Sequence, residues 1–171
     1  MKALTEVELD KLLAVARQHS ESDYLMLKVT FNHGLRVSET LALTRKNLVG
    51  GHLDVQRLKG SKRTRQPLLP NEAYALLKLA SSVEGRFFTM DRTTFWRRMR
   101  QYGEEAGIPV FKCHPHALKH TTGRLAYKGG MGIPEIQMYL GHVSGSNTMK
   151  YMEPDEEEAS KAFMNALGGT R

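Results

Sequence analysis

The sequence has a single cysteine, Cys113, which excludes an intramolecular disulfide and agrees with a reducing compartment. It also has no apolar run of the roughly 18 residues that a membrane-spanning helix requires. The N-terminal segment lacks an apolar core of signal-peptide length. We therefore expect a soluble, cytoplasmic protein without a membrane partner.

Motifs for several common kinds of enzyme are also missing. The chain has no GxxxxGK[ST] phosphate-binding loop and no GxSxG turn for a serine nucleophile. Four potential metal ligands do cluster within eight residues: Cys113, His114, His116 and His120. A zinc-protease helix of the HExxH type would, however, carry a glutamate where Ala117 stands, and the chain has no thiolate pair. We expect neither a metal ion nor another cofactor.

Positive charge is in excess, because 25 Lys and Arg against 18 Asp and Glu give a formal net charge of +7. Four of the acidic residues are confined to positions 155–158, so the rest of the chain is more basic than the total suggests. Such a balance favours a polyanionic partner, most often a nucleic acid. The apolar fraction of 40% is sufficient for one hydrophobic core, and we expect a single domain over residues 1–171.

Helical signals dominate the chain. Thr5 and Glu8 predict a capping box ahead of leucines at helical spacing, and Gly34 is placed to end a second helix. Between Leu53 and Leu69 apolar and polar residues alternate, which predicts a small antiparallel hairpin or sheet. These patterns together predict an α+β, mainly helical fold. Further helices are expected over 37–43, after a cap at Asn71, after a cap at Thr93 or Thr94, over 115–129, from Pro134, at a turn capped by Ser146 or Asn147, and over about 155–167.

Four motifs follow one another along the chain: GLRVSE at 34–39, LKGSKRTRQPLLP at 58–70, HPHALKHT at 114–121 and LGHVSGSNTMKY at 140–151. Their order resembles the catalytic domain of the tyrosine recombinase (phage integrase) family, over nearly the whole chain. That family has an Arg in GxRxSE, a Lys at a β-hairpin, HxLRH, LGH, and a Tyr nine residues after the last His. The matching positions here hold Arg36, Lys59, His116, His142 and Tyr151. Each motif is weak alone, whereas four in order are specific.

The resemblance implies a site-specific recombinase that cleaves and rejoins DNA through a covalent 3′-phosphotyrosine intermediate. Tyr151 would attack a phosphodiester, Arg36 would hold a nonbridging oxygen with its planar fork, and Lys59 would protonate the leaving 5′-oxygen. His116 and His142 would hydrogen-bond the same phosphate. Because fixed cations stabilise the developing charge, the reaction implies neither ATP nor a metal.

One position departs from the family pattern. Lys119 stands in HALKH where the family has a second phosphate-binding arginine, three residues after His116 and thus on the same helical face. Lysine keeps the charge but loses the fork. Three alternatives follow for the activity: lysine is natural here and tunes the activity, it weakens the activity, or it was introduced deliberately to reduce the activity. The alternative function is a sequence-specific DNA-binding module of the same fold with little strand transfer.

Ordinary structural roles remain open at several of these positions. Arg36 has Glu39 three residues on as a surface ion-pair partner. Lys62 competes with Lys59 as the acid, and His142 is placed to cap a helix C-terminus. The other tyrosines are expected to be packing residues: Tyr24, Tyr74, Tyr102, Tyr127 and Tyr139.

Two basic clusters are expected to contact DNA, with a solvated face as the alternative: Lys62, Arg63 and Arg65 in the hairpin, and Arg97, Arg98 and Arg100 on a helix. The resemblance implies double-stranded DNA as partner, nucleoid association, a homotetramer on two DNA sites (a monomer without DNA) and accessory directionality proteins. It also implies that the C-terminal helix, about 155–167, packs in trans. The family's N-terminal DNA-clamping domain is absent from residues 1–171, which indicates either an excised fragment or a minimal recombinase of a phage or mobile element.

Overall fold

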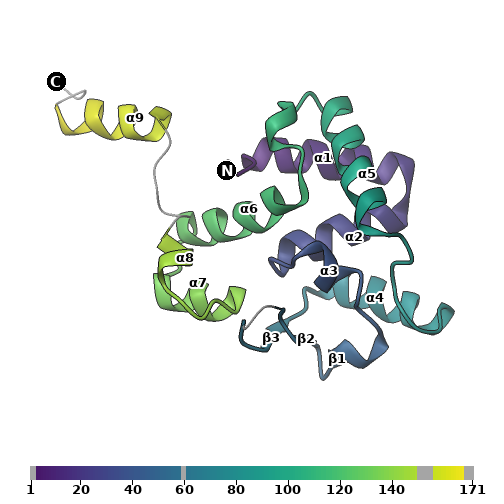
Figure 1. The fold of residues 1–171 in the computed structure, drawn as a ribbon. Coiled ribbons are helices and arrows are strands. Elements are labelled where there is room, and N and C mark those ends of the chain that lie inside the picture. Colours follow the sequence, from purple (N-terminus) through teal and green to yellow (C-terminus); the bar gives the residue numbers. More distant parts are fainter. Residues whose placement is uncertain (1–2, 59–60, 150–155, 168–171) are drawn as a thin grey trace.

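Helix α2 (Glu21–Asn32) is the centre of the fold in the computed structural model, which describes residues 3–58, 61–149 and 156–167. It contacts α1 (Glu6–His19), α3 (Val37–Thr40), α4 (Pro70–Ser82) and α6 (Pro115–Lys128) (Figure 1). The capping box that begins α1 is confirmed, because Thr5 Oγ1 accepts from the N–H of Glu8 and the Glu8 carboxylate accepts from the N–H of Thr5. Burial of Leu12 and Met26 between these helices supplies part of the core.

Two of the expected helix starts are wrong by a few residues. Helix α5 (Arg92–Glu105) is capped by Asp91, which accepts from the N–H of Thr94 at 2.6 Å, so Thr93 and Thr94 lie in its first turn. Helix α4 begins at Pro70 rather than after a cap at Asn71. Proline at the first helical position loses no hydrogen bond, because that N–H has no partner within the helix.

The expected hairpin is present and belongs to a three-stranded antiparallel sheet. Strands β1 (Leu48–Val49), β2 (His52–Val55) and β3 (Thr64–Pro67) are paired in that order, with Val55 opposite Thr64 next to the connection between β2 and β3. The inward residues of β3, Thr64 and Gln66, are polar and buried. Strand β3 therefore adds polar groups to the interior, whereas Val55 and Leu53, which lie opposite on β2, belong to the main apolar core.

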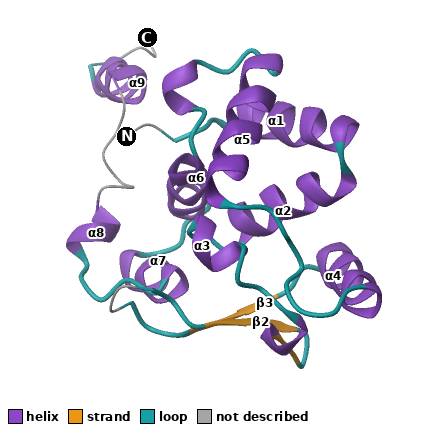
Figure 2. Ribbon diagram, turned by 45° about the vertical axis from the view of Figure 1, so that its right-hand side comes forward, coloured by secondary structure: helices purple, strands orange, loops and turns teal. Residues whose placement is uncertain are grey.

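The remaining elements are short or lie near the C-terminus. Helix α3 ends at Thr40, before the expected residue 43, and a 3₁₀ helix, Arg45–Asn47, leads into the sheet. Another 3₁₀ helix, Val110–Lys112, precedes α6. Helices α7 (Ile133–Leu140), α8 (Ser146–Met149) and α9 (Glu156–Ala166) follow, and α9 lies apart from the other helices (Figure 1). Figure 2 shows the sheet at one end of the helical body, with α7 on one side and α4 on the other.

The tyrosines do not all pack as expected. Tyr102 is buried, but Tyr74 is 72% exposed and Tyr127 is 42% exposed, so the prediction is wrong for these two. Within the described residues, no helix combines the length and the apolar character needed to cross a bilayer.

Candidate active site

Arg36 follows a turn that requires glycine. Gly34 has a φ of +53°, and a Cβ at this position would lie 2.3 Å from Leu140 Cδ2 of α7. The turn therefore brings the start of α3 against the end of α7. Arg36 Nη1 donates to Glu39 Oε1 at 2.8 Å and to Ser61 Oγ at 3.4 Å, yet its side chain remains 26% exposed. Its guanidinium is thus aligned and still accessible to an anion.

Glu39 is the buried partner of Arg36, so the pair is not the surface ion pair considered from the sequence. Its carboxylate accepts from the N–H groups of Arg36 and Leu58, at 2.8 and 3.1 Å, and from Arg57 Nη1 at 3.1 Å. Burial by itself would raise the pKa of Glu39, but these hydrogen bonds and the charge of Arg57 hold the pKa below its ordinary value. Glu39 therefore stays ionised and fixes Arg36.

Arg57, which comes before the basic residues of the hairpin in the chain, is fully buried. It donates to Glu39 and to the backbone carbonyls of His33, Gly34 and Tyr139. One sequence signal for this placement exists: Arg57 continues the alternation of Leu53 and Val55, both of which are buried. Glu39 and Arg57 are the two residues of the site whose role the motifs did not show.

Lys119 and His116 occupy α6 as expected, but their surroundings differ. His116 is exposed in the first turn of the helix, whereas Lys119 is only 6% exposed and its Nζ donates to Leu140 O at 3.4 Å. Burial, followed by the charges of Arg57 and Arg36, lowers the pKa of Lys119 from 10.5 to about 7. Near neutral pH this lysine therefore exists in both charged and neutral forms.

His142 follows the left-handed residue Gly141, which caps α7, so His142 itself is not the helix cap considered from the sequence. It is 7% exposed, and its Nδ1 lies 3.0 Å from Thr148 Oγ1 on α8. Burial, followed by the charge of Lys119, lowers its pKa to about 4. The backbone carbonyl of Gly141 accepts from the N–H of Lys62 at 3.1 Å, which joins this turn to the hairpin. His142 is thus neutral at pH 7 and held beside Lys119.

Two of the predicted catalytic residues, Lys59 and Tyr151, lie outside the described residues. Their neighbours along the chain do lie at the site: Leu58 bonds Glu39 through its N–H, and Ser61 accepts from Arg36. Thr148, which contacts His142, lies three residues before Tyr151.

The predicted DNA-contacting residues are distributed over exposed parts of the hairpin and α5. Lys62 and Arg65 are exposed, and Arg63 makes two 2.6 Å hydrogen bonds to Asp54. On α5, Arg97 is exposed, Arg98 pairs with the buried carboxylate of Asp23, and Arg100 pairs with Glu104 at 3.0 Å while its Cζ lies 5.5 Å from the centre of the Trp96 ring.

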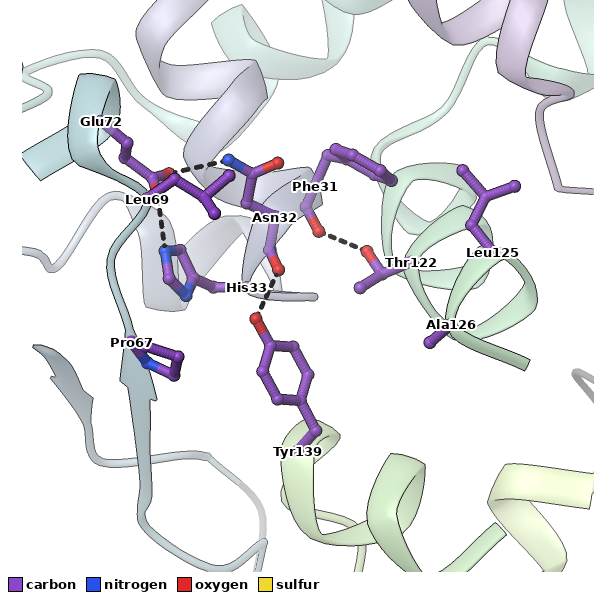
Figure 3. Close-up of a pocket in the computed structure, with 10 residues that line it drawn as sticks. All are labelled: Phe31, Asn32, His33, Pro67, Leu69, Glu72, Thr122, Leu125, Ala126 and Tyr139. Atoms are coloured by element: carbon purple, nitrogen blue, oxygen red, sulfur yellow. Dashed lines mark hydrogen bonds and ion pairs between the residues drawn. The ribbon is translucent and has the colours of Figure 1, made fainter. Parts of the chain in front are cut away.

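A cavity of about 250 Å³ lies behind the site, between the end of α2, β3, α6 and α7 (Figure 3). The His33 ring is held there between Glu72 Oε2 and Gln66 Oε1, each at 3.1 Å. Tyr139 reaches the same region, and its hydroxyl donates to Asn32 O at 2.8 Å. Within residues 3–58, 61–149 and 156–167, no group of three or more His, Cys, Asp or Glu is arranged to hold a metal ion.

Comparison with known proteins shows to which family the chain belongs. The sequence pattern of the phage integrase family matches residues 2–158. Tyrosine recombinase XerA of Pyrococcus furiosus is 34% identical over 98% of this chain and 65% of its own length. The type 1 fimbriae regulatory protein FimE of Escherichia coli K12 is 31% identical over 75% of this chain and 73% of its own length. The chain spans about three fifths of the length of the XerA relatives that it matches.

Solved structures show the same fold. A crystal structure of XerA recombinase aligns with a TM-score of 0.81 and 24% identity, covering 97% of this chain and 65% of that one. The catalytic domain of bacteriophage HP1 integrase aligns with a TM-score of 0.73 and 22% identity, covering 100% of this chain and 99% of that domain. The mainly helical fold with its small antiparallel sheet is therefore that of a tyrosine recombinase catalytic domain, and the chain belongs to the phage integrase family.

Proposed function

We propose that this chain is the strand-cleaving and strand-joining domain of a site-specific DNA recombinase, with Tyr151 as its nucleophile. The observation that carries the proposal is the charge of the site. Within the described residues, the cationic side chains of Arg36, Arg57 and Lys119 surround one buried carboxylate, Glu39. An uncompensated charge in a protein interior is costly, and an anion that enters the site offsets that cost.

A phosphodiester fits this site. Its two nonbridging oxygens suit the exposed fork of Arg36 on one side and Lys119 on the other. His142, which is neutral because its pKa is about 4, hydrogen-bonds the phosphate without adding charge. The site therefore stabilises the extra negative charge that develops on a phosphate under attack.

The reaction follows from these positions. The Tyr151 oxygen attacks the phosphorus and its proton passes to water, while the bond to the 5′-oxygen breaks and that oxygen takes a proton from Lys59. The 3′-phosphotyrosine ester conserves the bond energy, so a 5′-hydroxyl of another strand reverses the step. His116, exposed at the start of α6, is a second hydrogen-bond donor to the phosphate.

Double-stranded DNA is the proposed partner, contacted by the exposed cations of the hairpin and α5. Among relatives of the same fold, XerH has been solved bound to its difH substrate. Strand exchange between two sites requires several protomers, and we place a homotetramer on the DNA, with accessory proteins setting direction. Helix α9 is suited to packing on another protomer, because it lies apart from the body and exposes Phe163 and Met164, and Leu167 just after its end is exposed as well.

The test is covalent trapping. The chain is mixed with a pool of random-sequence duplexes that carry a nick, so that a short 5′-hydroxyl fragment diffuses away after cleavage. We expect a denaturant-stable protein–DNA adduct that Tyr151→Phe abolishes, and sequencing of the trapped DNA identifies the site. Tyr139→Phe is the matched control, because this tyrosine donates to a backbone carbonyl behind the site.

One observation favours a second function. Lys119 lacks the fork of an arginine and is partly neutral at pH 7, so the site is weaker than its relatives' pattern implies. A sequence-specific DNA-binding module of the same fold would bind duplexes in the pool and leave no adduct at any pH. That outcome rejects the recombinase and supports the module.

A further inference from the structure

Arg57 uses its whole hydrogen-bonding capacity inside the protein. A guanidinium has five N–H groups, and five acceptors surround this one. Nε donates to Thr64 Oγ1 at 2.9 Å, Nη1 donates to Gly34 O at 3.2 Å and Glu39 Oε2 at 3.1 Å, and Nη2 donates to His33 O at 2.8 Å and Tyr139 O at 3.3 Å. The side chain is fully buried, so none of these bonds is shared with bulk solvent.

The acceptors belong to the segments that carry the proposed catalytic residues. His33 and Gly34 form the turn just before Arg36, and Glu39 binds Arg36 directly. Tyr139 lies in the last turn of α7, three residues before His142. Thr64 begins β3, on the far side of the hairpin connection that contains Lys59. One side chain therefore joins three segments that are distant in the sequence.

We infer that Arg57 is a positioning residue, an inference that rests on the proposed function. Arg57 holds the segments of Arg36 and His142, together with Thr64 of the hairpin, in the one arrangement that binds a phosphate. Two of its acceptors are carbonyls at the ends of α2 and α7, where a helix leaves carbonyl oxygens without partners and favours positive charge. A lysine would supply the charge but would not reach acceptors in three directions.

Arg57 also acts on Lys119 through its charge. The two side chains donate to successive carbonyls at the end of α7, Arg57 to Tyr139 O and Lys119 to Leu140 O. After burial, Arg57 has the largest effect in lowering the pKa of Lys119, followed by Arg36, while Glu39 opposes both. The titratable or charged groups around Lys119 come from four segments: Arg36 and Glu39, Arg57, His120 and His142. Removing the Arg57 charge is therefore expected to raise the pKa of Lys119.

The first measurement needs no DNA. The titration of Lys119 is followed by NMR of lysine labelled at the side-chain terminus, and Lys119→Met assigns its signal. In Arg57→Met we expect the pKa of Lys119 to rise toward its ordinary value, and in Arg57→Lys to change less. An unchanged pKa in Arg57→Met would overturn the inference, because Arg57 then does not act on the site.

The second measurement is the rate of adduct formation with the trapped duplex. A displacement of about 1 Å at a catalytic group costs roughly 100-fold in rate, so we expect a loss of that order in Arg57→Met and a smaller loss in Arg57→Lys. The pH at which the rate falls should also move upward in Arg57→Met, which a loss of stability alone would not produce. The control is Leu12→Ala, which removes core packing on α1 and costs about 2–5 kcal/mol.

The outcomes separate the inference from the proposed function. If the variants of Arg57 lose no more activity than Leu12→Ala at the same folded fraction, the inference fails while the function stands. If the wild-type chain forms no adduct, the proposed function fails, and the titration alone then decides whether Arg57 acts on Lys119. If Arg57→Met does not fold, both measurements are made on Arg57→Lys. A pKa of Lys119 and a rate of adduct formation equal to those of the wild type would then overturn the inference.

Discussion

Replacing Lys119 by arginine is expected to remove a pH dependence from the proposed reaction. Lys119 is buried and its pKa is lowered to about 7, first by burial and then by Arg57 and Arg36. About half of the molecules therefore carry this charge at pH 7, and the charged fraction falls roughly tenfold for each pH unit above it. Arginine stays charged throughout this range.

The assay measures the second-order rate constant for adduct formation at limiting DNA. The pH dependence of this constant reports the pKa values of the free protein. For the wild type we expect it to fall roughly tenfold per pH unit above about pH 7. For Lys119→Arg we expect little fall. Two pH units above the pKa of Lys119, the rate constant of the variant should therefore exceed that of the wild type by roughly 100-fold. His142 does not share in this change, because its pKa of about 4 leaves it neutral over the whole range.

The matched control is Lys78→Arg, an exposed lysine on α4 that tests for a general effect of arginine on DNA binding. Overpacking is the main risk, since a larger side chain in a close-packed site costs about 1–3 kcal/mol. The folded fraction of each variant is therefore measured first. A wild-type rate that does not depend on pH, or an equal dependence in Lys119→Arg, would refute the reasoning.

The same titration affects stability, with a defined sign. The pKa of Lys119 is lower in the folded chain than its ordinary value of 10.5, so between about pH 7 and 10.5 the unfolded chain binds more protons. This group therefore makes the free energy of unfolding rise with pH in that window, by at most about 1.4 kcal/mol per pH unit, and has no effect on the slope below it. Urea unfolding of the wild type should show this rise relative to Lys119→Arg.

Three further predictions follow from the site and its surface. Lys59→Ala should regain adduct formation when sulfur replaces the bridging 5′-oxygen, because a thiolate leaves without a proton; recovery by Lys62→Ala instead would make Lys62 the acid. Glu39→Gln should lower the free energy of unfolding in urea by about 3–5 kcal/mol, since it leaves buried cations without their carboxylate, and an unchanged value would contradict the buried pair. Arg97→Ala should lower the salt dependence of DNA binding, measured by anisotropy, by about one counterion. Arg98→Ala should mainly lower the free energy of unfolding, because it leaves the carboxylate of Asp23 buried without this partner. The opposite pattern would exclude Arg97 as the DNA-contacting residue of the two.

Local signals in the sequence were sufficient for much of the fold. The capping box at Thr5, the helix stop at Gly34 and the alternation in the hairpin are short-range features, because a cap or a turn depends on residues within one helical turn. Thr93 and Thr94 were both suited to cap α5, but the helix begins earlier, because Asp91, two residues before Thr93, accepts from the N–H of Thr94.

The sequence by itself determined the family of this protein and the residue types of its proposed site, because motif spacing is a property of the chain. Only the tertiary structure decided the surroundings of those residues. The burial of Arg57 and Glu39, the lowered pKa of Lys119 and the close approach of Leu140 to Gly34 all depend on contacts between segments far apart in the chain. Desolvation and the charges of distant neighbours are set when those segments pack together, which no local pattern records.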